Sequence, residues 1–441
     1  MECKKYDNII IGAGPAGMRA CAIARQLGET VCVIERHEVG GTCLNRGCIP
    51  TKALVQSASV VSTVFSASEF GVEVDGDVRV DYSVASMRKD KVIEALRHGA
   101  ALSLGPDSLL KGEASLLNRN IVKVGDEMLQ ADKRIIIATG SSPARLGLPG
   151  NDLALTSDDF LRLDTLPADM VVIGGGVIGM ECACIAYAFG CKVTVIEYCR
   201  EILPGLDGEM AKRLRSMLSR RGIDILTGAS VMSLSQGISN NVDICYADRR
   251  GEHTVSASMV LMATGRRPVI PDGAEAIGMD VSHKGIVVDD SMATSVPGVY
   301  AVGDCNGRLM LAHAATAQAE VAMGVRDSIS HVPSVVFTSP ECAQVGIVSA
   351  ETPGRLIVGK SMYGANGMAA SMGRTEGFVK VALDADSHRI AGCCAIGAGA
   401  DAIVQEAAVA MSAGYTAGDL RSRVVFAHPT LSELLLSALP G

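Results

Sequence analysis

The sequence predicts an α/β protein, because one pattern of buried strand, glycine-rich turn, helix and second strand occurs twice. The first copy spans residues 7–35, and the second spans residues 170–197. The distance from the first glycine of the turn to the acid that ends the second strand is the same in both copies. Strands that are unbroken apolar runs are typical of a parallel sheet covered on both faces by helices. The two copies therefore predict two Rossmann-like dinucleotide-binding domains.

The glycine-rich turns contain the residue types that binding of a pyrophosphate requires. The first glycine allows a tight turn, the second lets the backbone approach the phosphates, and the third lets helix and strand pack closely. Amide groups at the helix N-terminus then face the phosphate charge, and the acid binds a ribose hydroxyl. The two sets are Gly12, Gly14, Pro15, Ala16, Gly17 and Glu35, and Gly174, Gly176, Val177, Ile178, Gly179 and Glu197.

Two dinucleotide-binding turns imply two nucleotide cofactors. An acid at both ribose positions favours NAD over NADP, because Glu197 would repel a 2′-phosphate and the nearest arginine after it is Arg200. Glycines that serve only as turns are the alternative interpretation. The complete strand, turn, helix, strand and acid in both copies argue against it.

A second repeated stretch marks where each nucleotide-binding unit ends. Residues 135–143 resemble residues 261–268, because each stretch contains an apolar strand followed by an Ala-Thr-Gly turn. We expect each turn to close one unit. The residues concerned are Ala138, Thr139, Gly140 and Gly265.

Two cysteines, Cys43 and Cys48, follow the first glycine-rich turn. On a regular helix, residues five apart are separated by a rise of about 7.5 Å, whereas a disulfide needs Cα atoms within about 7 Å. The pair can therefore bridge only if the chain departs from regular helix between them, which Gly47 permits; Pro50 suits the first turn of a following helix. Two buried, unpaired cysteines are the alternative, since the chain has 14 cysteines. The neighbouring nucleotide motif favours a redox-active pair.

Composition argues against other classes of function. The formal net charge is −8, from 40 basic and 48 acidic residues, so no basic excess is available to neutralise a nucleic acid. No apolar run of about 20 residues lacks glycine or charge, and no membrane span is predicted. The apolar N-terminal stretch is broken by Gly12 and Gly14, which indicates a strand rather than a secretion signal. We therefore expect a cytoplasmic protein whose oxidised cysteine pair is catalytic, and we predict no metal site.

Several further motifs, together with those above, resemble the flavoprotein pyridine nucleotide–disulfide oxidoreductase family. They are the cysteine motif at residues 40–52 and the stretches at residues 299–304, 311–314 and 427–433. The resemblance covers essentially the whole chain and is strongest to the dihydrolipoamide dehydrogenase branch of the family. It implies FAD in the first unit, NAD in the second, and electron transfer between them and a thiol substrate through a Cys43–Cys48 disulfide.

The resemblance also implies roles for individual residues. Cys43 would attack the substrate disulfide, and Cys48 would form a thiolate against the flavin. Lys52 and Glu181 would pair near the flavin N5, and Ile178 would gate the nicotinamide pocket. Val231 is added to the predicted NAD site. The further residues implied at the FAD site are Arg36, Gly41, Thr42, Lys52, Gly112, Glu113, Ala114, Ala138, Thr139, Gly140, Gly303, Asp304, Leu311, Ala312 and His313.

By resemblance, His428 and Glu433 would form an acid–base pair that reaches the disulfide of the other subunit. The residue types suit this role, because disulfide exchange needs a thiolate, an imidazole can move the proton, and a carboxylate can orient the imidazole. Residues 430–433 also match a capping box. The two roles are compatible, since one oxygen of Glu433 can serve each. The resemblance also favours a cis bond before Pro429.

Three implied site residues have a simpler interpretation from the sequence alone. Asp304 is compatible with a plain turn, His313 with a histidine satisfied in the core, and Glu181 with a first-turn acid favoured by the helix dipole. Cys393 and Cys394 are predicted to be buried packing residues.

The predicted organisation has four parts. They are a FAD-binding domain with the redox disulfide at 1–148, an NAD-binding domain at 149–267, a segment completing the FAD site at 268–332, and a C-terminal α+β dimerisation domain at 333–441. A homodimer is therefore expected. The stretch at residues 349–355 looks shorter than its family counterpart, and the chain ends soon after Glu433; both features put the stability of the dimer in doubt.

The leading hypothesis is an NAD-dependent dihydrolipoamide dehydrogenase. Its partner would be a lipoyl-bearing acyltransferase or carrier protein of a 2-oxoacid dehydrogenase, acetoin or glycine-cleavage system. A glutathione reductase is disfavoured by Glu197, which opposes NADP. A mercuric reductase usually carries a C-terminal cysteine pair, and no cysteine follows Glu433 in this sequence. An inactive scaffold would have lost catalytic residues, which are intact.

Overall fold

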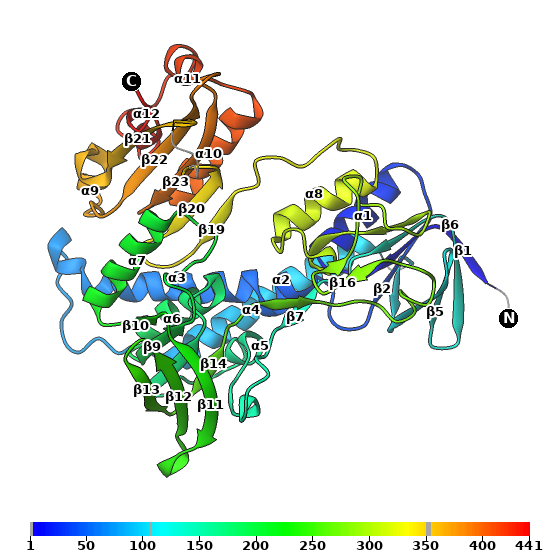
Figure 1. Ribbon diagram of the computed structural model, residues 1–441, viewed down its shortest axis with the longest axis horizontal. Coiled ribbons are helices and arrows are strands. Elements are labelled where there is room, and N and C mark those ends of the chain that lie inside the picture. Colours follow the sequence, from blue (N-terminus) through cyan, green and yellow to red (C-terminus); the bar gives the residue numbers. More distant parts are fainter. Residues whose placement is uncertain (1–2, 106, 350–353) are drawn as a thin grey trace.

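The computed structural model describes residues 3–105, 107–349 and 354–441, arranged as three sheet-based units (Figure 1). The shortened stretch at 349–355 therefore falls mostly outside the described residues. Within the described ranges, no helix is long and apolar enough to cross a membrane. The α/β fold class is confirmed.

The first unit contains a seven-stranded sheet. Its strands are β1 (Lys4–Ile11), β2 (Val31–Glu35), β3 (Leu109–Lys111), β4 (Ala114–Asn118), β5 (Ile121–Val124), β6 (Glu127–Ile137) and β18 (Val299–Ala301). The order is β3-β2-β1-β6-β5-β4, with β18 also paired to β6. β3, β2, β1, β6 and β18 are parallel, whereas β4 and β5 form an antiparallel extension.

Successive isoleucines in β1 and β6 pack on opposite faces of this sheet. Ile10 and Ile136 pack on the face covered by α1 (Pro15–Gln26) and α8 (Ala312–Ala322). Ile9, Ile11 and Ile135 pack on the opposite face. Each isoleucine that is fully buried contributes about 1.5–3 kcal/mol. The strands are therefore buried on both faces, as their continuous apolar sequence predicts.

Three helices after β2 extend away from this sheet. They are α2 (Gly41–Arg46), α3 (Cys48–Phe65) and α4 (Tyr82–Leu104), with a 3₁₀ turn η1 (Ala67–Phe70) after α3. Leu54, Tyr82 and Ala85 from these helices join the hydrophobic core of the second unit. The redox motif is thus held between the first and second units.

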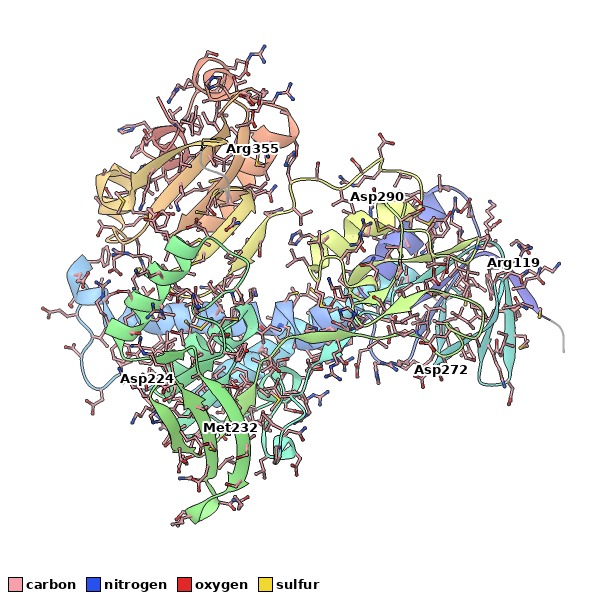
Figure 2. All side chains as sticks on the ribbon, in the orientation of Figure 1. Arg119, Asp224, Met232, Asp272, Asp290 and Arg355 are labelled. Carbon is pink, nitrogen blue, oxygen red and sulfur yellow. The ribbon has the colours of Figure 1, made fainter. Side chains whose placement is uncertain are left out.

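The second unit repeats the first. Its sheet has the order β10-β9-β8-β14 and consists of β8 (Asp169–Ile173), β9 (Lys192–Glu197), β10 (Asp224–Thr227) and β14 (Val260–Met262). Helices α5 (Ser157–Phe160), α6 (Val177–Ala188) and α7 (Gly208–Arg221) belong to it, as do the 3₁₀ turns η2 (Asn151–Leu153) and η3 (Ile238–Asn240). An antiparallel sheet of β11 (Ser230–Gln236), β12 (Val242–Asp248) and β13 (Gly251–Ala257) completes it. Asp224 and Met232 are exposed on its surface (Figure 2).

The third glycine of each turn has the predicted packing role. A Cβ atom on Gly17 would lie 1.9 Å from the carbonyl oxygen of Gly12, and one on Gly179 would lie 2.0 Å from that of Gly174. Contacts this short exclude any side chain at Gly17 and Gly179. Both glycines therefore let a helix approach the strand before it.

The segment at residues 268–332 returns the chain to the first unit. It contains β16 (Val281–Ser282), β17 (Gly285–Ile286), β18, the 3₁₀ turn η4 (Gly303–Asn306) and α8. Figure 2 shows Asp272 and Asp290 from this segment on the first unit. Two short strands, β7 (Ser141–Pro143) and β15 (Arg266–Pro268), pair where the chain crosses between the units.

The C-terminal part is an antiparallel five-stranded sheet with helices. The order β19-β20-β23-β22-β21 comprises β19 (Ser334–Val336), β20 (Cys342–Gly346), β21 (Leu356–Met362), β22 (Phe378–Asp384) and β23 (Ile390–Ile396). The helices are α9 (Gly367–Ser371), α10 (Ala400–Ser412), α11 (Ala417–Arg423) and α12 (Glu433–Ser437), with a 3₁₀ turn η5 (Tyr363–Ala365). Cys393 and Cys394 are fully buried in β23, as predicted.

Helix α7 connects the second unit to the C-terminal sheet at both of its ends (Figure 1). Asp207, the N-cap residue, accepts hydrogen bonds from Lys380 Nζ on both carboxylate oxygens at 3.0 Å. At the other end, Arg221 donates to the carbonyl oxygen of Ser339 at 2.7 Å. A shared core that includes Val336 and Ile396 lies between these contacts. The second unit and the C-terminal sheet are therefore packed as one body.

Candidate functional site

The two cysteines of the redox motif meet because the helix is interrupted between them. α2 ends at Arg46, Gly47 is non-helical, and α3 begins at Cys48. A Cβ atom on Gly47 would lie 2.9 Å from the carbonyl oxygen of Thr42, so a side chain would push the two helices apart. The structure has both cysteines as free thiols, and the two thiol groups interact closely enough for each to shift the pKa of the other.

This contact makes the two thiols unequal. The hydrogen bond from Cys43, helped by the charge of Lys52, lowers the pKa of Cys48 from 9.0 to about 7, although burial opposes the change. The pKa of Cys43 is raised, because its proton is held by Cys48 and its sulfur is buried. Cys48 is therefore the thiol of the reduced pair that loses its proton more readily.

Lys52 forms an ion pair beside the cysteines. Lys52 Nζ lies 2.9 Å from both carboxylate oxygens of Glu181, which comes from α6 in the second unit. Phe337 contacts both members of the pair: its backbone N–H donates to Glu181 Oε1 at 2.9 Å, and Lys52 Nζ lies 4.5 Å from its ring centroid. Glu181 is 4% exposed and is a buried partner of Lys52. The alternative of a first-turn acid favoured by the helix dipole is wrong, because the first turn of α6 has no acidic residue and Glu181 follows it.

A cavity of about 910 Å³ extends from the first glycine-rich turn to the cysteines and the Lys52–Glu181 pair. Val177 and Ile178 of the second turn also line it. The predicted FAD-site and catalytic residues in its lining are Gly12, Gly14, Pro15, Ala16, Glu35, Arg36, Gly41, Thr42, Cys43, Cys48, Lys52, Gly112, Glu113, Ala114, Ala138, Thr139, Gly140, Glu181, Gly303, Asp304, Leu311, Ala312 and His313.

Some predicted residues do not line this cavity. They are Gly17, Gly174, Gly176, Gly179, Glu197, Val231, Gly265, His428 and Glu433. Gly17 and Gly179 serve helix–strand packing instead. Val231 packs partly against the core that contains Ile196. The NAD contacts of the second unit stay a prediction.

The two acids predicted to bind ribose hold their own glycine-rich turns. Glu35 accepts a hydrogen bond from the backbone N–H of Ala13 at 2.8 Å, and Glu197 accepts one from that of Gly175. The second oxygen of each acid accepts from the residue two positions later. A carboxylate has about four acceptor sites, so both acids keep capacity for a ribose hydroxyl while fixing the turn.

The large cavity suits a dinucleotide that contains flavin. Gly14 borders it at the N-terminus of α1, where a Cβ atom would have only the Cα of Gly41 within 4 Å and would project into the space. The first turn of α1 has no acidic side chain, so its free amides face the cavity without a competing anion. The volume lies within the range of cofactor sites, about 300–1,000 Å³.

His428 and Glu433 form the predicted pair. His428 Nδ1 lies 3.0 Å from Glu433 Oε1, and Glu433 Oε2 accepts from the backbone N–H of Thr430 at 3.0 Å. The carboxylate therefore orients the imidazole with one oxygen and holds the turn with the other. The capping box is only half formed, because α12 has no hydrogen bond from its backbone to a capping side chain. The Thr430 hydroxyl donates instead to the carbonyl oxygen of Ala427. The His428 side chain is 78% exposed, and the bond before Pro429 is cis.

Two residues with simpler sequence interpretations have specific positions. Asp304 in η4 accepts a hydrogen bond from the Ser141 hydroxyl at 2.5 Å and lines the cavity. The alternative of a core histidine at 313 is wrong, because His313 is exposed and its Nε2 donates to the carbonyl oxygen of Pro333 at 2.8 Å. His313 is the second residue of α8 and lines the cavity together with Ala312.

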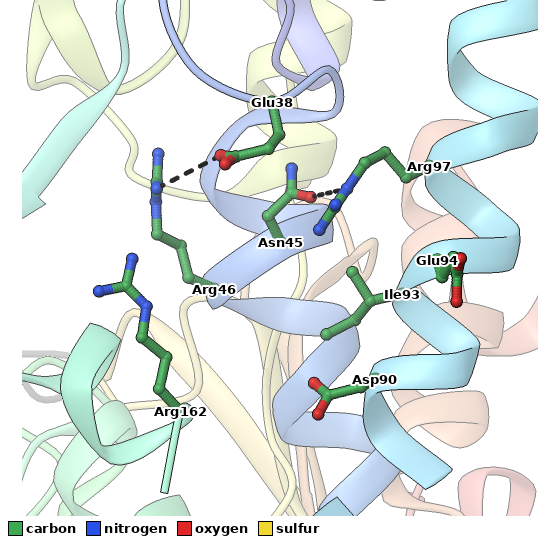
Figure 3. Close-up of a pocket in the computed structure, with 8 residues that line it drawn as sticks. All are labelled: Glu38, Asn45, Arg46, Asp90, Ile93, Glu94, Arg97 and Arg162. Atoms are coloured by element: carbon green, nitrogen blue, oxygen red, sulfur yellow. Dashed lines mark hydrogen bonds and ion pairs between the residues drawn. The ribbon is translucent and has the colours of Figure 1, made fainter. Parts of the chain in front are cut away.

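The turn before the redox helix is held from α4 (Figure 3). Asn45 Nδ2 donates to the carbonyl oxygens of Val39 and Gly41, at 3.0 and 2.9 Å. Arg97 Nε donates to Asn45 Oδ1 at 2.8 Å and fixes the amide in that orientation. A second cavity of about 400 Å³ lies beside these groups. Its lining residues are Glu38, Asn45, Arg46, Asp90, Ile93, Glu94, Arg97 and Arg162.

Comparison with family models decides the family. Residues 6–319 match the model described as pyridine nucleotide-disulphide oxidoreductase, and residues 332–439 match the dimerisation domain of the same family. The chain belongs to this family. It is an oxidoreductase with a disulfide redox centre that uses FAD and NAD, and it carries a dimerisation domain.

Named relatives span the whole chain. A dihydrolipoyl dehydrogenase of Bacillus subtilis is 35% identical, with 98% of this chain and 97% of the relative covered. A protein of the same name from Thermus scotoductus is 37% identical, with 99% and 97% covered. Among solved structures, the Cu(II) complex of the HOCl-induced flavoprotein disulfide reductase RclA from Escherichia coli matches with a TM-score of 0.87 and 27% identity, covering 99% of both chains.

Sequence reasoning missed residues that act through distant segments. Phe337 and Arg97 belong to no motif recognised in the sequence, and each contacts a predicted site residue or its supporting turn. Ser141 and Arg266 lie in the two repeated stretches but were not assigned to the site; Ser141 bonds to Asp304, and Arg266 bonds to Ser141. The repetition of the Ala-Thr-Gly turns was a usable signal for Ser141 and Arg266. Phe337 and Arg97 left no such signal.

The inequality of the thiols predicts the effect of replacing Cys43. Cys43→Ala removes the hydrogen bond to Cys48, so the pKa of Cys48 should rise from about 7 towards 9.0. Cys43→Ser keeps a donor and should raise it less. The measurement is the pH dependence of Cys48 alkylation in the reduced protein, located by peptide mass spectrometry. Identical profiles for the two variants would contradict the role of the hydrogen bond.

The contacts of Phe337 predict the effect of replacing its ring. Phe337→Leu keeps the amide donor but removes the ring over Lys52, and a cation–π contact of about 0.5–1 kcal/mol or more is lost. We expect flavin reduction by NADH to slow about twofold to tenfold and the pKa of Cys48 to rise, because Lys52 is held less firmly. Phe337→Tyr keeps the ring and is the matched control. Stopped-flow absorbance and Cys48 alkylation measure the two effects; equal behaviour of both variants would contradict the contact.

Proposed function

We propose that the chain is an NAD-dependent dihydrolipoamide dehydrogenase. The observation that carries the proposal is the unequal dithiol: Cys48 is the thiolate beside Lys52, and Cys43 is the protonated partner, both in one cavity with the glycine-rich turn. An acid at residue 197 favours NAD over NADP. Support also comes from the relatives, which are named dihydrolipoyl dehydrogenases and match over almost their full length.

The exchange begins with the Cys43–Cys48 disulfide. A dihydrolipoyl thiolate attacks Cys43 Sγ, a new S–S bond forms, and Cys48 leaves as the thiolate that its low pKa favours. The second substrate thiol then attacks the substrate sulfur bonded to Cys43, which closes the lipoyl disulfide and releases Cys43. The two substrate protons end on Cys43 and on His428 of the partner subunit, and Cys48 stays ionised.

The residues around Cys48 support the next stage. FAD held in this cavity would supply a two-electron acceptor for the dithiol, and NAD would supply a hydride acceptor beyond it. Lys52 stabilises the negative charge of Cys48 and is itself fixed by Glu181 and Phe337. Val177 and Ile178 border the same space from the second unit, where the nicotinamide would approach.

The acid–base pair is proposed to act across a dimer. Within one chain, His428 is exposed and does not line the cavity that contains Cys43. The dimerisation domain supplies the means to bring it to the cavity of another copy. The hydrogen bonds that Glu433 accepts from the Thr430 amide and from His428 lower the pKa of Glu433, so the carboxylate stays ionised and can orient the imidazole.

We propose that the substrate is carried by a lipoyl-bearing acyltransferase or carrier protein of a 2-oxoacid dehydrogenase, acetoin or glycine-cleavage system. The lipoyl arm presents the same dithiol in all of them. We also propose a cytoplasmic location, since a reducing compartment suits a catalytic rather than structural cysteine pair.

A second candidate is another FAD-dependent disulfide or metal-ion reductase. The similarity to the flavoprotein disulfide reductase RclA, whose structure is a Cu(II) complex, favours it, since that similarity covers 99% of both chains. The two candidates share the cysteine pair and differ in the substrate that meets Cys43.

Anaerobic titration of the purified FAD-containing protein separates these candidates. With dihydrolipoamide we expect two-electron reduction, a long-wavelength absorbance from the Cys48 thiolate against the flavin, and lipoamide-dependent oxidation of NADH. Turnover with Cu(II) or glutathione disulfide in place of lipoamide is the comparison. Absence of lipoamide turnover in FAD-loaded protein would exclude the leading proposal; turnover with Cu(II) or glutathione disulfide alone would support the second candidate.

Mixed dimers test whether the acid–base pair acts between subunits. His428→Gln should reduce lipoamide turnover by about 10²-fold or more, as for loss of a general acid–base group, and Cys43→Ser should abolish it. A dimer of one chain of each kind keeps one complete site if His428 serves the other subunit. Co-expression with two affinity tags, followed by activity measurement, checks this. A mixed dimer as inactive as its parents would place both groups in one subunit.

A further inference from the structure

Ser141 and Arg266 bring the two nucleotide-binding units together at the wall of the large cavity. Ser141 begins β7 directly after the Ala-Thr-Gly turn of the first unit, and Arg266 begins β15 at the equivalent position of the second. β7 and β15 are antiparallel, with Arg266 opposite Pro143 and Pro268 opposite Ser141. The repeated turns therefore meet, and both Ser141 and Arg266 line the cavity.

The hydrogen bonds around Ser141 have a fixed direction. Arg266 Nε donates to the Ser141 hydroxyl oxygen at 2.7 Å, and Arg266 Nη2 donates to the Ser141 carbonyl oxygen at 2.8 Å. A guanidinium only donates, so the hydroxyl oxygen must accept. The one hydroxyl hydrogen is then directed to Asp304 Oδ2, 2.5 Å away. This leaves Asp304 Oδ1 without a hydrogen bond among the described residues.

The backbone under Asp304 is fixed independently. Gly303 donates its N–H to Gln318 Oε1 at 2.7 Å, and the same oxygen accepts from Asn306 Nδ2 at 2.7 Å. Gln318 is 1% exposed. With the turn held from α8, the remaining freedom of Asp304 is rotation of its side chain. The Ser141 hydroxyl removes that freedom through a charge-assisted bond.

We propose that Ser141 and Arg266 are positioning residues for Asp304, so that retention of FAD by the first unit depends on an arginine of the second. The inference rests on the proposed placement of Asp304 against the hydroxyl-bearing chain of FAD. Asp304 Oδ2 is held by Ser141, and Asp304 Oδ1 is kept for a hydroxyl group of the ligand. Loss of either positioning residue frees the carboxylate to rotate and weakens binding.

FAD release from the purified holoenzyme on dilution, followed by the fluorescence of free FAD, tests this. Ser141→Ala and Arg266→Gln should raise the dissociation constant about tenfold or more, as expected for one hydrogen bond to a charged group. Ser141→Thr keeps the hydroxyl and should restore binding. Arg267→Gln is the matched control and should have no effect, since Arg267 is exposed in β15 and its side chain makes no hydrogen bond or ion pair with the residues described.

A purely structural role for Ser141 is distinguished by a double-mutant cycle. If Ser141 acts through Asp304, FAD release from Asp304→Ala and from Asp304→Ala/Ser141→Ala will be equal, whereas a further loss in the double variant would overturn the inference. Unchanged FAD affinity in Asp304→Ala would overturn it as well. Thermal melting establishes that each variant is folded. The FAD-release assay contains neither thiol substrate nor NAD, so its result does not depend on lipoamide activity. Failure of the proposed function would be seen in the lipoamide turnover assay instead.

Discussion

The interruption of the helix at Gly47 is the constraint on which the chemistry of this chain depends. In one continuous helix, Cys43 and Cys48 would be turned apart. The break lets the Cys43 thiol reach the Cys48 sulfur and decides which sulfur ionises. It also starts α3 at Cys48, which puts Lys52 one helical turn later on the same face. One backbone departure thus sets both the hydrogen bond and the charge that lower the pKa of Cys48.

The duplication of the nucleotide-binding unit makes the two glycine-rich turns of the site alike. The two turns that close the units differ from each other. Glu35 and Glu197 fix equivalent turns with equivalent hydrogen bonds, so both units keep the same geometry for a ribose. The turns that close the units differ where Ser141 in one copy is replaced by Arg266 in the other. That difference lets the two turns bond to each other, which two serines or two arginines would not do as well.

Features that depend on residues close together in the chain could be predicted from the sequence. The glycine-rich turns, the break near Gly47 and the His428–Glu433 pair all lie within short segments whose residue types carry the geometry. Phe337 was not predictable, because it reaches Lys52 only after β19 packs beside α6. The residues around His313 predicted a core histidine. This was wrong because apolar neighbours in the chain do not reveal which end of α8 faces solvent.

The C-terminal domain reaches the site by two routes, and these have different physical consequences. Phe337 fixes the Lys52–Glu181 pair within one chain, so it needs no second copy. His428 is exposed within its own chain and is useful only if another surface brings a disulfide to it. If His428 acts as proposed, a loosened dimer would impair proton transfer to the substrate while leaving the ionisation of Cys48 intact. On the proposed mechanism, the electron path would be built into each chain, whereas the proton path would depend on assembly of the dimer.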